Sequence, residues 1–256
     1  VFAPPAGQVA TVHVTVSPLV LLTVLAFLVP WAAARLRVRA WAYRLACHAV
    51  RLYLQRRTKS AVIVYTGSIE CGSASGLVQR ILQVPAAREL VLVIDTFGGD
   101  TYAGVQIAHA LAAHPGKVTI RVPDVCASSG TVIACAGDRI VMGPHATLSY
   151  TDVIGYSEPT EIRAAMRVVA DAQGKAIESV RAEATLARVA MAIADARIAR
   201  GQHGPTARAL AERLTFAKVD HWTPLFPEEA RQLGLPVHVD SDRIWYLLVY
   251  LSSWAR

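Results

Sequence analysis

Runs of β-branched and other apolar residues alternate along this chain with stretches that have the period of a helix. Short apolar runs occupy residues 61–65 and 90–94, and a run rich in β-branched residues occupies 117–122. Between the last two runs, apolar side chains recur every three or four residues over positions 105–112, which is typical of an amphipathic helix. Strand, helix and strand in this order predict a right-handed parallel βαβ unit. The chain is therefore expected to contain an α/β domain.

Both strands of this unit end in small residues. The first is followed closely by the pair Gly98 and Gly99, and the second leads through a turn to the pair Ser128 and Ser129. In parallel sheets, ligands bind beyond the carboxyl ends of the strands. We therefore expect the glycine pair and the serine pair to face one cleft.

This arrangement suits acyl transfer. A serine at a strand-to-helix turn projects its hydroxyl, and the N–H of the next residue points toward a developing oxyanion. A Gly-Gly turn on the neighbouring strand offers a second N–H with no side chain to block a substrate. The structural alternative is an ordinary glycine turn, with Ser128 as the N-cap of a helix.

Longer motifs extend this picture. The segments DTFGGDTYAGVQIAHAL and VPDVCASSGTVIACAGDRIVMGPHATL resemble the Clp protease and crotonase superfamily. His221, Trp222 and Thr223, followed by PEEARQLGLPV at residues 227–237, resemble a late segment of the serine dehydrogenase proteinase family of membrane-anchored bacterial proteins. The similarity covers most of residues 60–238 and implies a Clp protease/crotonase-like domain of ββα repeats.

The chain departs from the family pattern at several positions. Phe97 stands where the family turn P-G-G has proline, and Ser129 stands where S-G-G-T has glycine. Ser149 and Tyr150, and then Val153 and Ile154, depart from the family segment L-G-P-x-D-P around Asp152. These departures are expected to bear on the shape of the pocket and on activity more than on the fold.

The resemblance implies a role for each matched residue. Ser128 would attack a peptide carbonyl, Lys175 would take its proton, and no ATP would be needed. The N–H groups of Gly99 and Ser129 would form the oxyanion hole. The residues expected to contact substrate are Phe97, Gly98 and Asp152.

Lys175 also has a chemical argument in its favour. Only three lysines follow residue 60, namely Lys117, Lys175 and Lys218, among many arginines. A buried lysine can lose its proton and act as a base, whereas arginine cannot. The alternative is a surface lysine that pairs with Asp171 and Glu178 on one helix.

Other side chains near the serine compete for these roles. Clp-type proteases carry a histidine just after a short strand, and alignment at Pro144 puts Thr151 at that place. His145, in the preceding turn, remains an alternative base. Cys126 lies two residues before Ser128 and is an alternative nucleophile, although its position favours a place in the core or the pocket wall.

The N-terminal segment differs in composition from the rest. Residues 1–34 carry no charged side chain, and positions 14–34 suit one membrane span. Residues 1–59 hold eight basic and no acidic side chains, whereas residues 60–256 hold 18 basic and 19 acidic ones. The positive-inside rule then predicts a single-pass protein of the bacterial inner membrane with residues 35–256 in the cytoplasm. The alternative is a buried hairpin or core helix.

Two further helices are expected to flank the domain. Residues 36–57 form a basic amphipathic pattern, with arginine at 37, 44 and 51 opposite an apolar face that includes Trp41, Leu45, Ala49 and Leu52. This helix is expected to bind lipid headgroups or a neighbouring subunit.

The predicted organisation is a membrane segment at 1–34, a juxtamembrane helix at 35–59, the peptidase domain at 60–240 and an amphipathic helix at 241–256. The last helix would pack on a partner subunit, the N-terminal helix or the bilayer.

The sequence lacks the motifs of several common cofactor sites, which restricts the cofactors and partners to be expected. The four cysteines have no metal-ligand spacing, and the loop at 66–76 has neither dinucleotide nor P-loop glycine spacing. We therefore expect no metal and no cofactor. The basic residues are concentrated before the domain, which disfavours nucleic acid as a partner. The resemblance implies a homo-oligomer, as a trimer, hexamer or larger ring.

Two other functions fit parts of the pattern. A crotonase-like enzyme acting on an acyl thioester would use the same oxyanion hole, but it needs a carboxylate beside the serine turn, and only Asp124 is near it in the sequence. A catalytically inert oligomeric membrane scaffold would explain the departures at Phe97, Ser149 and Tyr150. We predict a membrane-anchored serine endopeptidase, with these two functions as alternatives.

Overall fold

The computed structural model describes residues 39–151, 176–217, 219–221 and 223–255. The candidate span at 14–34 and the predicted site residues Asp152 and Lys175 lie outside these ranges. Within the described ranges, no helix combines the length and apolar character needed to cross a membrane. The chain divides into two units, Val1–Ala42 and Tyr43–Arg256, and the second contains the features described below except residues 39–42, the start of a helix.

A five-stranded parallel sheet forms the centre of the second unit, in the order β1-β2-β3-β5-β8. Its strands are β1 (Ala61–Thr66), β2 (Leu90–Asp95), β3 (Val118–Val122), β5 (Arg139–Met142) and β8 (Val237–Val239). The first three coincide with the short apolar runs of the sequence, and β1, β2 and β3 lie side by side with parallel registers. The predicted α/β fold with a parallel sheet is therefore confirmed.

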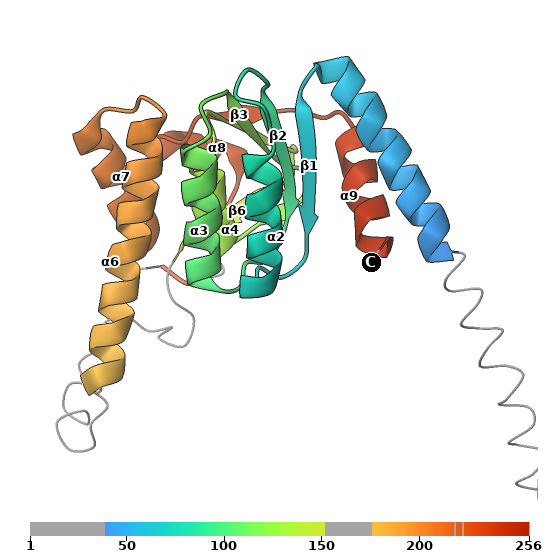
Figure 1. Ribbon diagram of the computed structural model, residues 1–256. Coiled ribbons are helices and arrows are strands. Elements are labelled where there is room, and N and C mark those ends of the chain that lie inside the picture. The colour runs from blue at the N-terminus through green and yellow to red at the C-terminus, as the bar shows by residue number, and fades with distance from the viewer. Residues whose placement is uncertain (1–38, 152–175, 218, 222, 256) are drawn as a thin grey trace, which may run out of the picture. The chain divides into compact units, whose positions relative to one another are not determined.

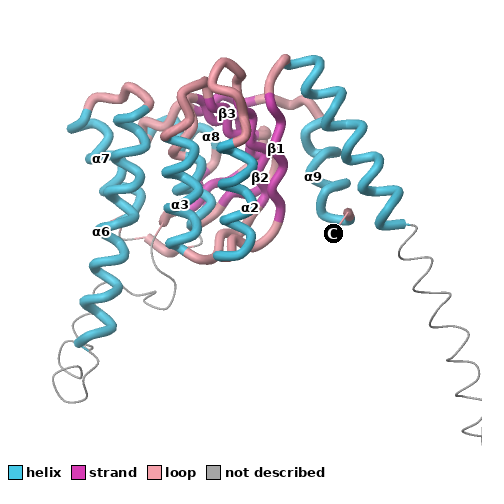
Figure 2. The backbone as a smooth tube through the Cα atoms, viewed as in Figure 1, coloured by secondary structure: helices cyan, strands magenta, loops and turns pink. Residues whose placement is uncertain are grey.

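Helices cover both faces of this sheet, because successive side chains of each strand point to opposite sides. On β2, Leu92 packs in the larger core, whereas Val91 and Val93 pack in a smaller one. The larger core is completed by α2 (Cys71–Leu82), α3 (Thr101–Ala112), α4 (Ser129–Ala134), α6 (Ala176–Ala199), α7 (Gly204–Thr215) and α8 (Pro227–Gln232). Figures 1 and 2 show α2 and α3 next to each other along the sheet.

The smaller core is closed by two helices from distant parts of the sequence. Leu54, on a helix that occupies residues 39–58, packs with Trp245 and Leu248 of α9 (Ile244–Trp254). The last helix therefore packs against the helix at 39–58 and against β1. Figure 1 shows both helices on the side of β1 that is opposite α2.

The buried face of the helix at 39–58 differs from the one expected. The sequence placed Leu45 and Ala49 on the apolar face, but both are exposed, and Leu45 retains 55% of its accessible surface. Val50 and Leu54 face the domain instead. Apolar residues occur on more than one side of this helix, so periodicity alone did not identify the side that packs.

A second, small sheet carries the serine turn. It consists of β4 (Val125–Cys126), β6 (Thr147–Ser149) and β7 (Pro224–Leu225), with β4 and β6 parallel. An isolated bridge between Thr96 and Cys126 links β4 to the residue that follows β2. This link brings the end of β2, with its glycine pair, next to the serine turn.

Candidate active site

Ser128 sits in a strained turn between β4 and α4. Its backbone angles are φ 55° and ψ −123°, and Lys59 is the only other non-glycine residue with positive φ among the described residues. Such a conformation costs about 1–3 kcal/mol and persists only where the surroundings impose it. A serine held in a sharp strand-to-helix turn is the arrangement of a nucleophile elbow, which exposes the hydroxyl at the edge of the sheet.

The turn around Ser128 is fixed by backbone hydrogen bonds on both sides. The N–H of Gly130 donates to the Ala127 carbonyl at 2.8 Å, and the N–H of Thr131 donates to the Ser128 carbonyl at 2.8 Å. The N–H of Ser128 itself donates to the side chain of Ser149 at 2.7 Å. These bonds are the local interactions that offset the strain.

The glycine pair lies directly against this turn. Gly98 and Gly99 have φ of +101° and +142°, which side chains rarely allow. A Cβ atom at Gly98 would lie 2.7 Å from the Ser128 Cβ and 3.2 Å from its Oγ. A Cβ at Gly99 would lie 2.2 Å from the carbonyl oxygen of Ile69. Both positions therefore require glycine, and the two turns meet as the parallel topology predicted.

Two backbone donors beside Ser128 have no acceptor among the described residues: the N–H of Gly99 and the N–H of Ser129. The carbonyl of Gly98 accepts from the N–H of Ile69 at 2.8 Å and from the Thr96 hydroxyl at 3.4 Å. Because a trans peptide is planar, anchoring this carbonyl fixes the direction of the Gly99 N–H on the opposite side.

Ser129 supplies the second donor because it begins α4, and the first N–H groups of a helix have no partner within the helix. Its hydroxyl also donates to the carbonyl of Gly99 at 3.3 Å, which ties the serine turn to the glycine turn. The N–H of Gly98, by contrast, is engaged by the Thr96 hydroxyl at 3.0 Å. Among the described residues, Gly99 and Ser129 therefore offer the donors that an oxyanion hole needs.

The residues considered as bases fall in different places. Thr151 is buried, with its N–H donating to the Leu214 carbonyl at 3.0 Å and its hydroxyl paired with that of Thr215 at 3.1 Å. Leu148 lies beside Cys126 in the β4–β6 register, so His145 is five residues upstream of the position beside Ser128. His145 is exposed and lies in the turn before β6, at the end of that strand away from Ser149.

Cys126 does not have the environment of a nucleophile. Its side chain is fully buried, and burial raises the pKa of its thiol well above the usual range. Burial likewise raises the pKa of Cys135 to about 12. Since the thiolate is the reactive form, both cysteines are inert, and Cys126 serves as packing beneath the serine turn.

Alkylation should distinguish these thiols. Iodoacetamide at pH 8 should modify the exposed Cys71 and leave Cys126 and Cys135 unmodified in the native protein, because their raised pKa values keep them protonated. Peptide mapping by mass spectrometry measures the modification of each cysteine. Labelling of Cys126 in the native protein at a rate similar to that of Cys71 would contradict this assignment.

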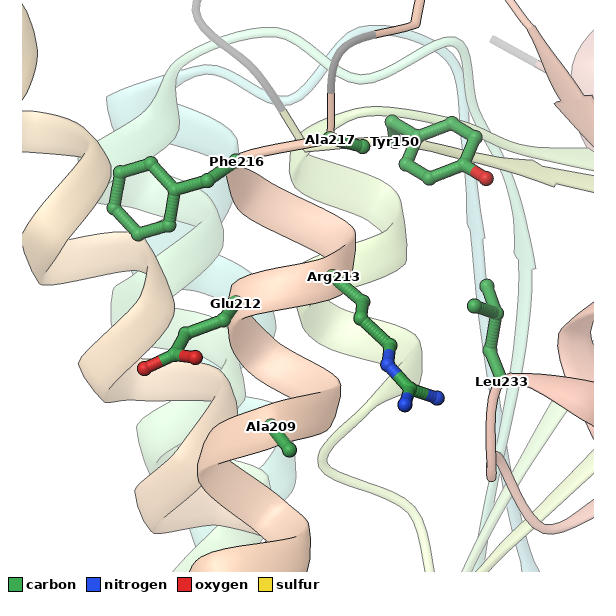
Figure 3. Close-up of a pocket in the computed structure, with 7 residues that line it drawn as sticks. All are labelled: Tyr150, Ala209, Glu212, Arg213, Phe216, Ala217 and Leu233. Atoms are coloured by element: carbon green, nitrogen blue, oxygen red, sulfur yellow. The ribbon is translucent and has the colours of Figure 1, made fainter.

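A groove of about 560 Å³ opens next to the end of β6 (Figure 3). Tyr150, which directly follows Ser149, forms one wall, and the side chain of Arg213 extends from α7 away from Tyr150, toward the side of the groove where Leu233 lies. The lining residues are Tyr150, Ala209, Glu212, Arg213, Phe216, Ala217 and Leu233. The sequence did not reveal this groove, because its walls come from three separated segments.

The structure thus brings together most of the predicted site residues that it describes. Ser128, Ser129, Gly98 and Gly99 form one contact region, and Phe97 stands 70% exposed at the start of the glycine turn. The supporting residues Thr96, Ile69 and Ser149 were not identified from the sequence. For Ser149, the departure from the family pattern was the available signal.

The chain matches a known protein family over most of its length. A family model described as ClpP-like SDH-type serine proteinase matches residues 19–254. Two uncharacterized proteins of Methanocaldococcus jannaschii are 32% identical over 181 residues and 27% identical over 188 residues. Each alignment covers 68% of this chain, and 62% and 61% of those proteins, so the chain spans about three fifths of their length.

More distant matches include a protease subunit and a solved structure. The proteolytic subunit of the ATP-dependent Clp protease of Lactococcus lactis subsp. cremoris is 30% identical over 87 residues, which cover 33% of this chain and 44% of that subunit. A mutant of a membrane-bound stomatin-specific protease aligns with 71% of this chain and 79% of its own, at 19% identity and a TM-score of 0.47.

Proposed function

The chain belongs to the ClpP-like SDH-type serine proteinase family, and from this premise we propose that it is a membrane-anchored, ATP-independent serine endopeptidase. The observation that carries the proposal is the strained Ser128, whose hydroxyl lies against a glycine turn between two backbone donors without acceptors among the described residues. A structural turn has no need of such strain together with two unused donors.

The first chemical step is attack of the Ser128 hydroxyl on a peptide carbonyl. Lys175, as a neutral amine, takes the hydroxyl proton while the new C–O bond forms. The carbonyl oxygen becomes negative and accepts hydrogen bonds from the N–H groups of Gly99 and Ser129. Fixed donors of this kind contribute about 2.7–4 kcal/mol each to the transition state.

The second step breaks the peptide bond. The protonated Lys175 returns its proton to the leaving amine, and the acyl group stays on Ser128 as an ester. Water then attacks this ester with the same lysine as base, through the same oxyanion site, and releases the carboxylate product. Neither step consumes ATP.

The choice of lysine as base has support from the described residues. Thr151, at the place of the Clp-type histidine, is buried and bonded to the end of α7. His145 lies at the wrong end of β6. Lys175 immediately precedes α6 in the chain and lies outside the described residues.

Substrate and location are part of the same proposal. Phe97, Gly98 and Asp152 contact an extended peptide, and the groove beside Tyr150 receives one of its side chains. The uncharged segment at 14–34 anchors the protein in the bacterial inner membrane, and the charge step that follows keeps the domain in the cytoplasm. The protein assembles as a homo-oligomer.

The proposal is tested with the full chain purified in detergent. It should cleave a mixture of unstructured peptides without ATP and should react with a serine-directed fluorophosphonate. New peptide termini identified by mass spectrometry measure the first activity, and in-gel fluorescence measures the second. Labelling without peptide cleavage, accompanied by hydrolysis of an acyl thioester, would favour the crotonase-like alternative. Absence of both activities would identify an inert scaffold.

A further inference from the structure

Ser149 occupies a position where the family segment L-G-P-x-D-P has glycine. It ends β6, it is 3% exposed, and its hydroxyl lies within hydrogen-bond distance of the backbone of Ser128. A glycine there would have no atom with which to make this contact. The departure from the family pattern therefore adds a specific interaction beneath the candidate nucleophile.

The hydrogen bonds around Ser149 fix the role of each partner. Its hydroxyl donates to the carbonyl of Tyr150 at 2.9 Å, so its single proton is used there. A lone pair of the same oxygen is then left to accept the N–H of Ser128, at 2.7 Å. The Ser149 hydroxyl oxygen is the one acceptor for the N–H of Ser128 among the described residues.

The Ser149 backbone is itself anchored to the serine turn. Its N–H donates to the Thr131 hydroxyl at 3.2 Å, and that hydroxyl donates to the carbonyl of Cys126 at 3.0 Å. Thr131 belongs to α4 and Cys126 to β4, the two elements that flank Ser128. Ser149 is thus held from both sides of the turn that it supports.

We propose that Ser149 is a positioning residue that holds Ser128 in its strained conformation. This role rests on the proposed peptidase function. The bond takes the place of a strand-to-strand hydrogen bond, because β6 ends at Ser149 while the chain of Ser128 has already turned toward α4. Without the Ser149 hydroxyl, the N–H of Ser128 has no acceptor and the strained backbone relaxes. The Oγ atom of Ser128 then moves out of alignment with the N–H groups of Gly99 and Ser129.

A small displacement is enough to affect the rate. Reacting groups about 1 Å out of place lower the rate by about 100-fold in enzymes that depend on alignment. Ser149 contacts the backbone rather than the substrate, so its loss should lower kcat and leave KM within about twofold. The same displacement should slow reaction with a fluorophosphonate, which needs the same hydroxyl and the same oxyanion hole.

The test compares Ser149→Ala and Ser149→Gly with a matched control, Ser60→Ala. Ser60 is also buried, at 1% exposure, and its hydroxyl donates to a local carbonyl, that of Thr58, at the amino end of β1. Alanine keeps the Cβ of Ser149 and removes only the oxygen, so this variant should fold even if the glycine variant does not. The readouts are kcat, KM, the second-order labelling rate and the thermal midpoint of each full-length variant.

Both Ser149 variants should lose about 10- to 100-fold in kcat and in labelling rate, whereas Ser60→Ala should keep the wild-type rates at a similar thermal midpoint. A folded Ser149→Ala with wild-type kcat and labelling rate would overturn the role of Ser149. Equal rate losses in Ser60→Ala and Ser149→Ala would also overturn it, since only general destabilisation would remain. Absence of labelling in the wild type would instead overturn the peptidase proposal itself.

Discussion

Replacement of Ser128 by alanine should abolish peptide hydrolysis, with a loss of about 10⁴-fold or more in kcat. Loss of a nucleophile that acts together with its base removes nearly all the catalysis that the pair supplies. The variant should fold, because alanine keeps the Cβ atom and the backbone bonds to Ser149 and Thr131 remain. Initial rates on a fluorogenic peptide and a circular dichroism melt measure the two properties.

The matched control for this substitution is Cys126→Ala. Cys126 is buried two residues away and its thiol stays protonated, so its removal should leave the rate within a few-fold of the wild type. If Ser128→Ala retained activity while Cys126→Ala lost it, the nucleophile would be the cysteine and the role given to the elbow would be wrong.

Replacement of Lys175 should have the second-largest effect, a loss of about 10²- to 10⁴-fold, which is the usual contribution of a general base. Arginine keeps the positive charge but cannot give up a proton, so Lys175→Arg should be as inactive as Lys175→Ala. In the wild type, activity should rise with pH as the amine of Lys175 loses its proton. Measured pH–rate profiles of the three proteins test both statements.

Two substitutions serve as controls for the lysine. Lys117→Arg changes a lysine just before β3, at the amino end of the sheet, and His145→Ala removes the histidine at the far end of β6. Both variants should keep wild-type rates. Near-normal activity in Lys175→Arg, together with a large loss in His145→Ala, would replace the serine–lysine pair with a histidine-based mechanism.

Local sequence patterns were sufficient to predict the strands β1 to β3 of the central sheet and the two turns of the site. The strands β1 and β2 are almost continuous apolar runs and β3 is rich in β-branched residues, because both faces of a parallel sheet are buried, and such runs are visible without any tertiary information. Gly98 and Gly99 were identified from their place directly after a strand, and the structure adds the reason for glycine there, since close approach to Ile69 and Ser128 leaves no room for a side chain. The meeting of the two turns follows from parallel topology.

The remaining features depend on contacts between segments that are distant in sequence. The hydrogen bond from Ser128 to Ser149 spans 21 positions, and nothing in the residue type of a serine indicates its partner. The groove beside Tyr150 needs α7 and the turn after α8 in place. The packed side of the helix at 39–58 depends on α9, which lies near the other end of the chain.

The most direct test of the central claim is localisation of the covalent adduct formed by a serine-directed fluorophosphonate. The full-length protein is labelled, digested and analysed by tandem mass spectrometry. The adduct should form once per chain and should map to the Ser128 hydroxyl, since that oxygen alone combines the strained turn with the donors of Gly99 and Ser129. An unlabelled protein, or an adduct on Ser129 or another residue with Ser128 unmodified, would contradict the proposal that this chain is a serine peptidase acting through Ser128.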